Sequence, residues 1–180
     1  TGLLMGMSTI QLHFMKHHAS IEKLNDKLTY YVEHDVLTGV YNRYHLNNQL
    51  EMIERNDLIN WAIIYIDLNY FKEVNDQFGH QKGDKALNEI GVKLKEVIHD
   101  LGIVTRYGGD EFVILVPCAT QELIDQMTQS IKELETDLSS FNHRLSFAIG
   151  SGIKTKANQS IYQVLDMAER AMYKDKRENK

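Results

Sequence analysis

The chain has 180 residues, 43% of them hydrophobic, which is enough for one domain with a substantial core and an additional segment. A net charge of −5 argues against non-specific binding to nucleic acid polymers, but it allows a single nucleotide whose charge is met by magnesium and a few lysines. One cysteine, Cys118, excludes an internal disulfide and fits a reducing compartment. We find neither an apolar run of membrane-span length nor a secretory leader, and the start at Thr1 indicates a piece of a longer protein.

Residues 1–33 predict a separate helix with one apolar seam. The spacing of the seam alternates between four and three residues, and its members are Leu3, Met7, Ile10, Phe14, His17, Ile21, Leu24, Leu28 and Tyr31. His17 is the only clearly polar member. Four strict heptads favour a parallel dimeric coiled coil, and the alternative is an amphipathic helix packed on its own domain.

From residue 34 onward the pattern is globular. In chain order we expect a helix at 44–55, a buried strand at 61–67 with a short helix after it, a helix at 83–99, a hairpin at Gly108-Gly109, a helix at about 121–138, a strand at 145–152 and a closing helix at 162–176. This irregular order predicts an α+β fold with a largely antiparallel sheet rather than a doubly wound fold.

Several carboxylates occupy positions that the fold alone does not require. Asp67 closes the buried strand, and Asp110 and Glu111 follow the two glycines on what we expect to be an exposed turn. Both places suit a divalent metal, and Lys72 adds a charge for phosphate groups. Asp67 alone is read equally well as the cap of the short helix that follows it.

The stretch from Asn75 to Asp84 holds two glycines and several polar side chains between a strand and a helix. A simple connector would be shorter, so this length indicates a functional segment. Without further context, Asp84 is better interpreted as the N-terminal cap of the following helix than as a functional residue.

Five segments stand in a recognisable order between about residues 33 and 180. They are Asp35-Val-Leu-Thr-Gly-Val-Tyr-Asn-Arg43, Asp67-Leu-Asn-Tyr-Phe-Lys-Glu-Val-Asn-Asp76, Phe78-Gly-His-Gln-Lys-Gly-Asp84, Arg106-Tyr-Gly-Gly-Asp-Glu-Phe112 and Ala168-Glu-Arg-Ala-Met-Tyr173 with Lys176. In sequence and spacing they closely resemble the GGDEF family, the diguanylate cyclases. The resemblance implies a palm-like, mostly antiparallel sheet flanked by helices at 34–180, preceded by a coiled-coil signalling and dimerisation helix at 1–33.

The resemblance also implies an activity. Two facing domains would each hold one GTP, and each 3′-hydroxyl would attack the other α-phosphate, giving cyclic di-GMP and two pyrophosphates. The implied cofactor is Mg²⁺, two ions per half-site, with Mn²⁺ as an alternative. The implied partner is a second copy bound through the N-terminal helix. We expect an upstream sensor domain outside this chain and a cytoplasmic location, either free or as the cytoplasmic part of a membrane-anchored bacterial protein.

Site residues follow from the resemblance position by position. The implied metal ligands are Asp67, the Leu68 carbonyl, Asp110 and Glu111. The implied catalytic residues are Asp110, Glu111 and Lys72, with Glu111 also a candidate to deprotonate the attacking hydroxyl. The implied GTP-binding residues are Asn75 and Asp84 for guanine, His80, and, for the phosphates, Lys72, Lys176, Lys180 and the backbone of Tyr70 and Phe71. The guanine assignment is chemically sound, because a carboxylate accepts from adjacent N1–H and amino groups that adenine lacks.

The chain departs from the family pattern at three places. His99 and Gly102 occupy the ends of the family's Arg-x-x-Asp product-binding motif, which argues against feedback inhibition through it. Asn69 stands where the family often has an aspartate. Lys180 stands where an arginine is common, and a lysine at this position can make only one bond to a phosphate.

Two other functions compete with an active cyclase. One is a catalytically silent member that binds GTP or cyclic di-GMP as a receptor, and the other is a dimerisation module with a scaffolding domain. The intact Gly108-Gly-Asp-Glu-Phe112 favours the enzyme, and the carboxylates Asp67 and Asp110 argue against a scaffold.

Overall fold

The computed structural model describes residues 2–135 and 145–178, with side chains from residue 11 onward within those ranges. The chain forms two compact units, 1–33 and 34–180. The first unit is α1 (Gly2–Glu33), and its described apolar seam residues are more than half exposed: Phe14, Ile21, Leu24, Leu28 and Tyr31. No helix in the described ranges combines the length and apolar character needed to cross a membrane.

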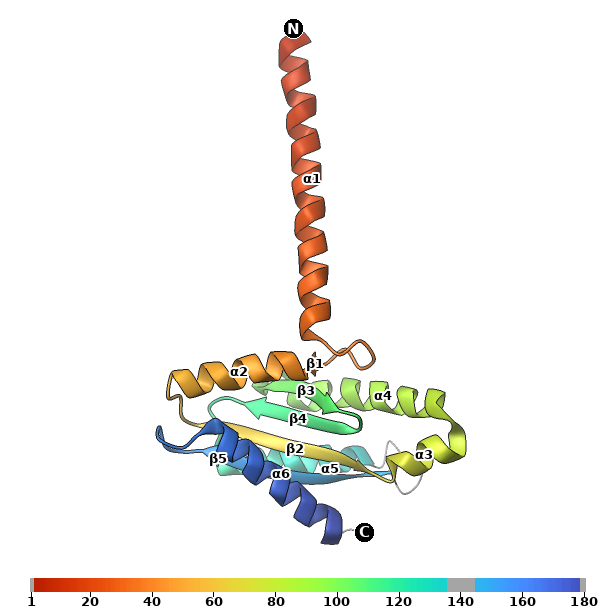
Figure 1. The fold of residues 1–180 in the computed structure, drawn as a ribbon, viewed down its shortest axis with the longest axis vertical. Helices are drawn as coiled ribbons and strands as arrows, with labels where there is room; N and C mark the ends of the chain where they lie inside the picture. The colour runs from red at the N-terminus through yellow and green to blue at the C-terminus, as the bar shows by residue number, and fades with distance from the viewer. Residues whose placement is uncertain (1, 136–144, 179–180) are drawn as a thin grey trace. The chain divides into compact units, whose positions relative to one another are not determined.

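A mixed sheet forms the centre of the second unit. The described residues contribute five strands in the order β1-β3-β4-β2-β5 (Figure 1). Their bounds are β1 (Tyr41–Asn42), β2 (Trp61–Asn69), β3 (Ile103–Gly108), β4 (Glu111–Val116) and β5 (Ser146–Lys154). Only the β1–β3 pair among these strands is parallel, so the predicted α+β fold with a mostly antiparallel sheet is confirmed.

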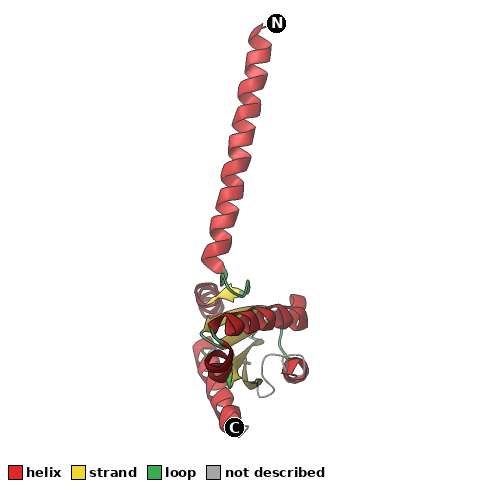
Figure 2. Ribbon diagram, turned by 90° about the vertical axis from the view of Figure 1, so that its right-hand side faces the viewer, coloured by secondary structure: helices red, strands yellow, loops and turns green. Residues whose placement is uncertain are grey.

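Helices cover both faces of this sheet (Figure 2). One layer contains α3 (Phe71–Phe78), α4 (His80–Ile98) and α5 (Gln121–Glu133), and the other contains α2 (Arg43–Arg55) and α6 (Ile161–Glu178). A 3-10 turn, η1 (His99–Leu101), follows α4. Side chains alternate along β2, so Ile64 packs with the first layer and Ile63 with the second. Burial on both faces explains the uninterrupted apolar run in β2.

The segment that follows β2 differs from its predicted form. Asn75–Asp84 is not a long connector, because α3 ends at Phe78 and α4 begins at His80 after the single residue Gly79. The break is sharp because Gly79 has φ +81°, a conformation that glycine adopts without strain. Asp84 therefore lies in the second turn of α4 and is not its cap, and the cap of α3 is Tyr70 rather than Asp67.

Other element boundaries shift by a few residues. The β2 strand extends two residues beyond Asp67, β5 ends at Lys154 and α6 ends at Glu178. The predicted end of the helix at residue 138 lies outside the described residues. Two helices begin at side-chain caps: Asn42 Oδ1 accepts from His45 N at 3.0 Å, and Thr120 Oγ1 accepts from Leu123 N at 3.2 Å.

Candidate active site

Asp67, Asp110 and Glu111 lie at one end of β2 and the β3–β4 hairpin. Asp67 and Glu111 are register partners across the β2–β4 pair, and the Leu68 N–H donates to the Asp110 carbonyl at 3.3 Å. Asp67 is buried, with 6% of its surface exposed. The turn is less open than predicted, since Asp110 and Glu111 are both half-buried and Gly109 is exposed.

These carboxylates repel one another inside a partly desolvated site. Burial, and then the charge of Asp67, raises the pKa of Asp110. Burial also raises the pKa of Glu111, with the charges of Asp67 and Asp110 adding to the effect and a hydrogen bond from Tyr65 opposing it. A cation bound between these oxygens would relieve that repulsion, and oxygen donors of this kind fit Mg²⁺.

Lys176, from α6, provides a positive charge at this site. Its Nζ lies 2.5 Å from Asp67 Oδ1. Lys176 therefore contacts a predicted metal ligand, a contact that its predicted role at the phosphates did not include. Within the described residues of one copy, no three acidic, histidine or cysteine side chains form a preformed metal cluster. A metal ion at Asp67 Oδ1 would therefore compete with Lys176 for this oxygen.

A hollow of about 600 Å³ opens beside the carboxylates. Six of the predicted site residues line it: Leu68, Tyr70, Phe71, Lys72, Asp110 and Lys176. Tyr70 has a left-handed backbone and starts α3 without a side-chain cap, so the positive end of the α3 dipole lies at this hollow. Two lysines and a helix N-terminus beside carboxylates suit a phosphate chain that carries divalent metal.

Three of the four remaining predicted substrate residues lie on α3 and α4. Asn75 lies against Gly83, because a Cβ added at Gly83 would be 2.0 Å from Asn75 Oδ1. Asp84, the next residue, lines a different hollow of about 710 Å³ with Leu37 and other residues of α4. His80 is exposed at the start of α4, and Lys180 lies outside the described residues. The structure thus brings Asn75 close to Asp84 but does not place Asp84 in the hollow that contains Lys72.

The model of the family described as "Diguanylate cyclase, GGDEF domain" matches residues 32–180. The chain belongs to the GGDEF family.

Individual relatives agree with this assignment. The bifunctional diguanylate cyclase/cyclic di-GMP phosphodiesterase MucR of Pseudomonas aeruginosa is 30% identical over 86% of this chain and 23% of its own length. The signaling protein YkoW of Bacillus subtilis is 32% identical over 82% of this chain and 19% of its own length. Among the first curated relatives it matches, the chain spans between 19% and 40% of their length.

Solved structures match as well. The GGDEF domain of YfiN from Pseudomonas aeruginosa is 29% identical, with a TM-score of 0.68, over 81% of this chain and 89% of that one. The coiled coil and GGDEF domain of DgcB from Caulobacter crescentus, in complex with c-di-GMP, has a TM-score of 0.77 over 93% of this chain and 94% of that one. At 21% identity, the DgcB match shows the fold alone.

Arg106 fixes the turn of this GGDEF domain, a role that sequence reasoning missed. Its Nε and Nη2 donate to the Gly109 carbonyl at 3.0 and 2.8 Å, and its Nη1 donates to Asp35 Oδ1 at 3.1 Å. Burial opposes ionisation of Asp35, but hydrogen bonds from Thr38 and the charge of Arg106 outweigh it and lower the Asp35 pKa. The conformation of the turn thus depends on a contact between residues 71 positions apart.

Replacing Arg106 by lysine is expected to lower the free energy of unfolding by about 1–2 kcal/mol, because lysine cannot reproduce the forked contact. Urea denaturation measures this change. The control is Arg55→Lys, since Arg55 pairs with Glu51 on an exposed helix face, where about 0.5 kcal/mol or less is expected. Equal losses in the two variants would contradict the role of Arg106.

Tyr65 is a second residue that the sequence did not single out. It lies on β2, with its side chain in the part of the core that α2 and α6 cover. Its hydroxyl donates to Glu111 Oε1 at 3.2 Å. Burial, and then the charge of Glu111, raises the Tyr65 pKa, so the phenol stays protonated and keeps donating. Tyr65 therefore fixes the orientation of the Glu111 carboxylate.

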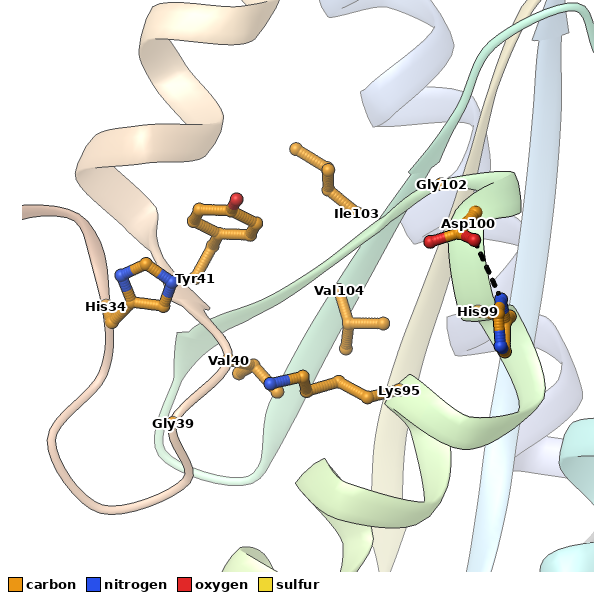
Figure 3. Close-up of a pocket in the computed structure, with 10 residues that line it drawn as sticks. All are labelled: His34, Gly39, Val40, Tyr41, Lys95, His99, Asp100, Gly102, Ile103 and Val104. Carbon is orange, nitrogen blue, oxygen red and sulfur yellow. Dashed lines mark ion pairs between the residues drawn. The ribbon is translucent and has the colours of Figure 1, made fainter. Parts of the chain in front are cut away.

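A third hollow, of about 530 Å³, lies where the family's product-binding motif is altered (Figure 3). His99 Nδ1 is 3.1 Å from Asp100 Oδ2, so the imidazole lies beside its own neighbour in the chain. Gly102 is packed closely, because a Cβ there would lie 2.6 Å from the Leu115 carbonyl oxygen. An aspartate at position 102 would therefore require the backbone to shift.

Proposed function

We propose that this domain is an active diguanylate cyclase that condenses two GTP molecules into cyclic di-GMP with release of two pyrophosphates, as a dimer with one GTP per subunit. The observation that supports this most directly is the convergence of Asp110, Lys72 and Lys176 at one hollow, with Asp67 in contact with Lys176. Nucleotidyl transfer depends mainly on positioning and charge neutralisation, and these residues can supply both.

In this proposal each residue has a defined role. Lys72 and Lys176 would hold phosphate oxygens, and the N-terminus of α3 would add to their positive potential. The metal ligands would be Asp67, the Leu68 carbonyl, Asp110 and Glu111, for two Mg²⁺ ions or for Mn²⁺. When bound, these ions neutralise charge on the phosphates and lower the pKa of a coordinated hydroxyl. Glu111, oriented by Tyr65, would accept the proton of the attacking 3′-hydroxyl.

The direct test is to incubate the protein with GTP and Mg²⁺ and to separate the products by chromatography, while sedimentation reports its oligomeric state. Cyclic di-GMP and pyrophosphate in a 1:2 ratio are expected. A dimeric sample that binds GTP but yields no product would contradict the proposal and favour a silent receptor.

Asn75 and Asp84 are proposed to recognise guanine, with His80 at the edge of the substrate site. Replacing Asp84 by serine is expected to reduce the preference for GTP over ATP by about 10- to 100-fold, because a charged acceptor for N1–H and the amino group is lost. Competition binding with the two nucleotides measures this preference. Asp125→Ser, at an exposed residue of α5 away from the hollows described above, is the control, and unchanged selectivity in Asp84→Ser would exclude the assigned role.

The second copy is proposed to bind through α1, whose exposed seam would become the core of a parallel coiled coil. A dimer would hold the two half-sites at a high effective concentration. Replacing Ile21 and Leu24 by asparagine is expected to shift half-maximal activity to at least about 10-fold higher protein concentration, because two apolar side chains leave the interface. Met15→Gln, an exposed change outside the seam, is the control, and a double variant that stays dimeric and fully active would refute the seam.

The cytoplasm is the proposed location, because GTP is a cytoplasmic substrate and the exposed thiol of Cys118 suits a reducing compartment. An upstream sensor domain is proposed to act on α1, since the curated relatives are much longer than the matched segment. A membrane anchor in the full-length protein would be compatible with this arrangement.

A further inference from the structure

Three histidines gather on a short part of α1. His13, His17 and His18 are all exposed, and the His13 and His17 rings meet edge to face with centroids 4.7 Å apart. That contact follows from their i, i+4 spacing, which places both side chains on one face of the helix. Two imidazoles one helical turn apart are a common means of holding a single metal ion.

The heptad pattern places these histidines at the proposed dimer interface. With Phe14 and Ile21 at a positions, His17 is at d, His13 at g and His18 at e. In a parallel dimer, d faces d of the other helix, and g faces the e position of the following heptad. His17 would therefore face His17 of the partner subunit, and His13 would face His18 of the partner subunit.

We propose that this level of α1 is a binding site for a first-row transition ion, Zn²⁺ in particular, with imidazoles contributed by both copies. The proposal rests on the coiled-coil dimer proposed above, since one copy alone provides no group of three ligands in its described residues. Imidazole nitrogen suits Zn²⁺, and it does not suit the Mg²⁺ of the catalytic carboxylates.

A neighbouring contact supports this assignment. His18 Nδ1 lies 3.3 Å from Glu22 Oε1, one turn further along α1. A carboxylate on one ring nitrogen orients the imidazole and leaves the other nitrogen for a metal, which is the usual environment of a zinc-ligating histidine. His17 is the polar member of the seam, and a polar side chain at a d position lowers the stability of a coiled coil. A metal ion bound by His17 would offset this loss.

Binding of Zn²⁺ across two copies would stabilise the dimer. At a free Zn²⁺ concentration 100 times the dissociation constant of the site, one bridging ion tightens dimerisation about 100-fold. By stabilising the dimer, the metal would control how often two catalytic half-sites meet.

The test measures dimerisation of the full chain by sedimentation equilibrium in constant Mg²⁺, with free Zn²⁺ set by a chelator buffer. We expect Zn²⁺ to lower the dimer dissociation constant at least 10-fold. In His17→Leu the zinc-free dimer should persist or tighten, because leucine suits a d position, and the response to Zn²⁺ should disappear. In His13→Gln the response should shrink, with basal turnover at saturating protein concentration unchanged. His99→Gln, in the globular unit, should respond like the unaltered protein.

The outcomes separate this site from the proposed function. A zinc-free dimer that makes cyclic di-GMP but shows no response to Zn²⁺ would overturn the metal site alone. A response that survives in His17→Leu would also overturn it, because the ions would then bind elsewhere. A chain that remains monomeric with and without Zn²⁺ would overturn the metal site and the coiled-coil dimer together.

Discussion

Replacing Asp110 by asparagine is expected to reduce cyclic di-GMP formation at least about 100-fold and, at neutral pH, to raise the melting temperature. The first effect follows from losing a proposed metal ligand. The second follows from electrostatics, since burial and Asp67 raise the Asp110 pKa, so that the ionised group opposes folding above that pKa. Product chromatography with GTP and Mg²⁺ measures the first effect, and calorimetry of the same preparation without divalent metal measures the second.

The pH dependence gives this prediction a specific sign. Because its folded-state pKa is raised, Asp110 destabilises the unaltered protein at neutral pH, and protonation removes this penalty as the pH falls toward the ordinary value of 3.8. The difference in melting temperature between the two proteins should therefore narrow with acidification. Asp125→Asn, which changes an exposed carboxylate of α5, should alter neither quantity appreciably. Near-normal turnover in Asp110→Asn would exclude Asp110 from the reaction.

Replacing Gly150 by alanine is expected to lower the free energy of unfolding by at least about 3 kcal/mol, at or beyond the upper end of typical overpacking costs. A Cβ at Gly150 would lie 2.1 Å from Met172 N and 2.2 Å from the Ala168 carbonyl oxygen. Both atoms belong to the backbone of α6, so no side-chain rotation can relieve the overlap. Because α6 carries Lys176, its displacement should also weaken GTP binding.

Gly152→Ala is the matched control for this change. It lies on the same strand, and its added Cβ would meet Val164 atoms at 3.1 Å, a distance that small shifts accommodate. A loss of about 1 kcal/mol is expected there. Urea denaturation of the two variants compares them directly, and equal midpoints would contradict the tight packing of α6 on β5 at Gly150.

The sequence predicted most of the fold because its signals are local. The apolar run of β2, the glycine turn of the hairpin and the heptads of α1 each specify an element within a few residues. The break between α3 and α4 was missed because a single residue, Gly79, makes it, and because the surrounding side chains are mostly polar. Polar residues on exposed helix faces give the same pattern as those in a loop.

The proximity of site residues could be predicted where a motif carries them, but contacts between residues distant in sequence could not, and the roles of these residues stay predictions. The grouping of Asp67 with Asp110 was expected from the resemblance, and the β2–β4 register places them together. The contact of Lys176 with Asp67 joins residues 109 positions apart, and that of Arg106 with Asp35 joins residues 71 apart. A periodicity of two or four residues carries no information about either contact.

The Lys176–Asp67 ion pair has a consequence for biosynthesis. Asp67 lies on β2, which pairs with β5 late in the chain, and Lys176, which contacts it, lies on the last helix. Contacts of this sequence separation form slowly, and a ribosome releases the chain from its N-terminus onward. A nascent chain in which α6 has not yet left the ribosome therefore cannot complete the hollow at the proposed phosphate site. The proposed nucleotide binding should thus begin only when nearly the whole domain has been synthesised and folded.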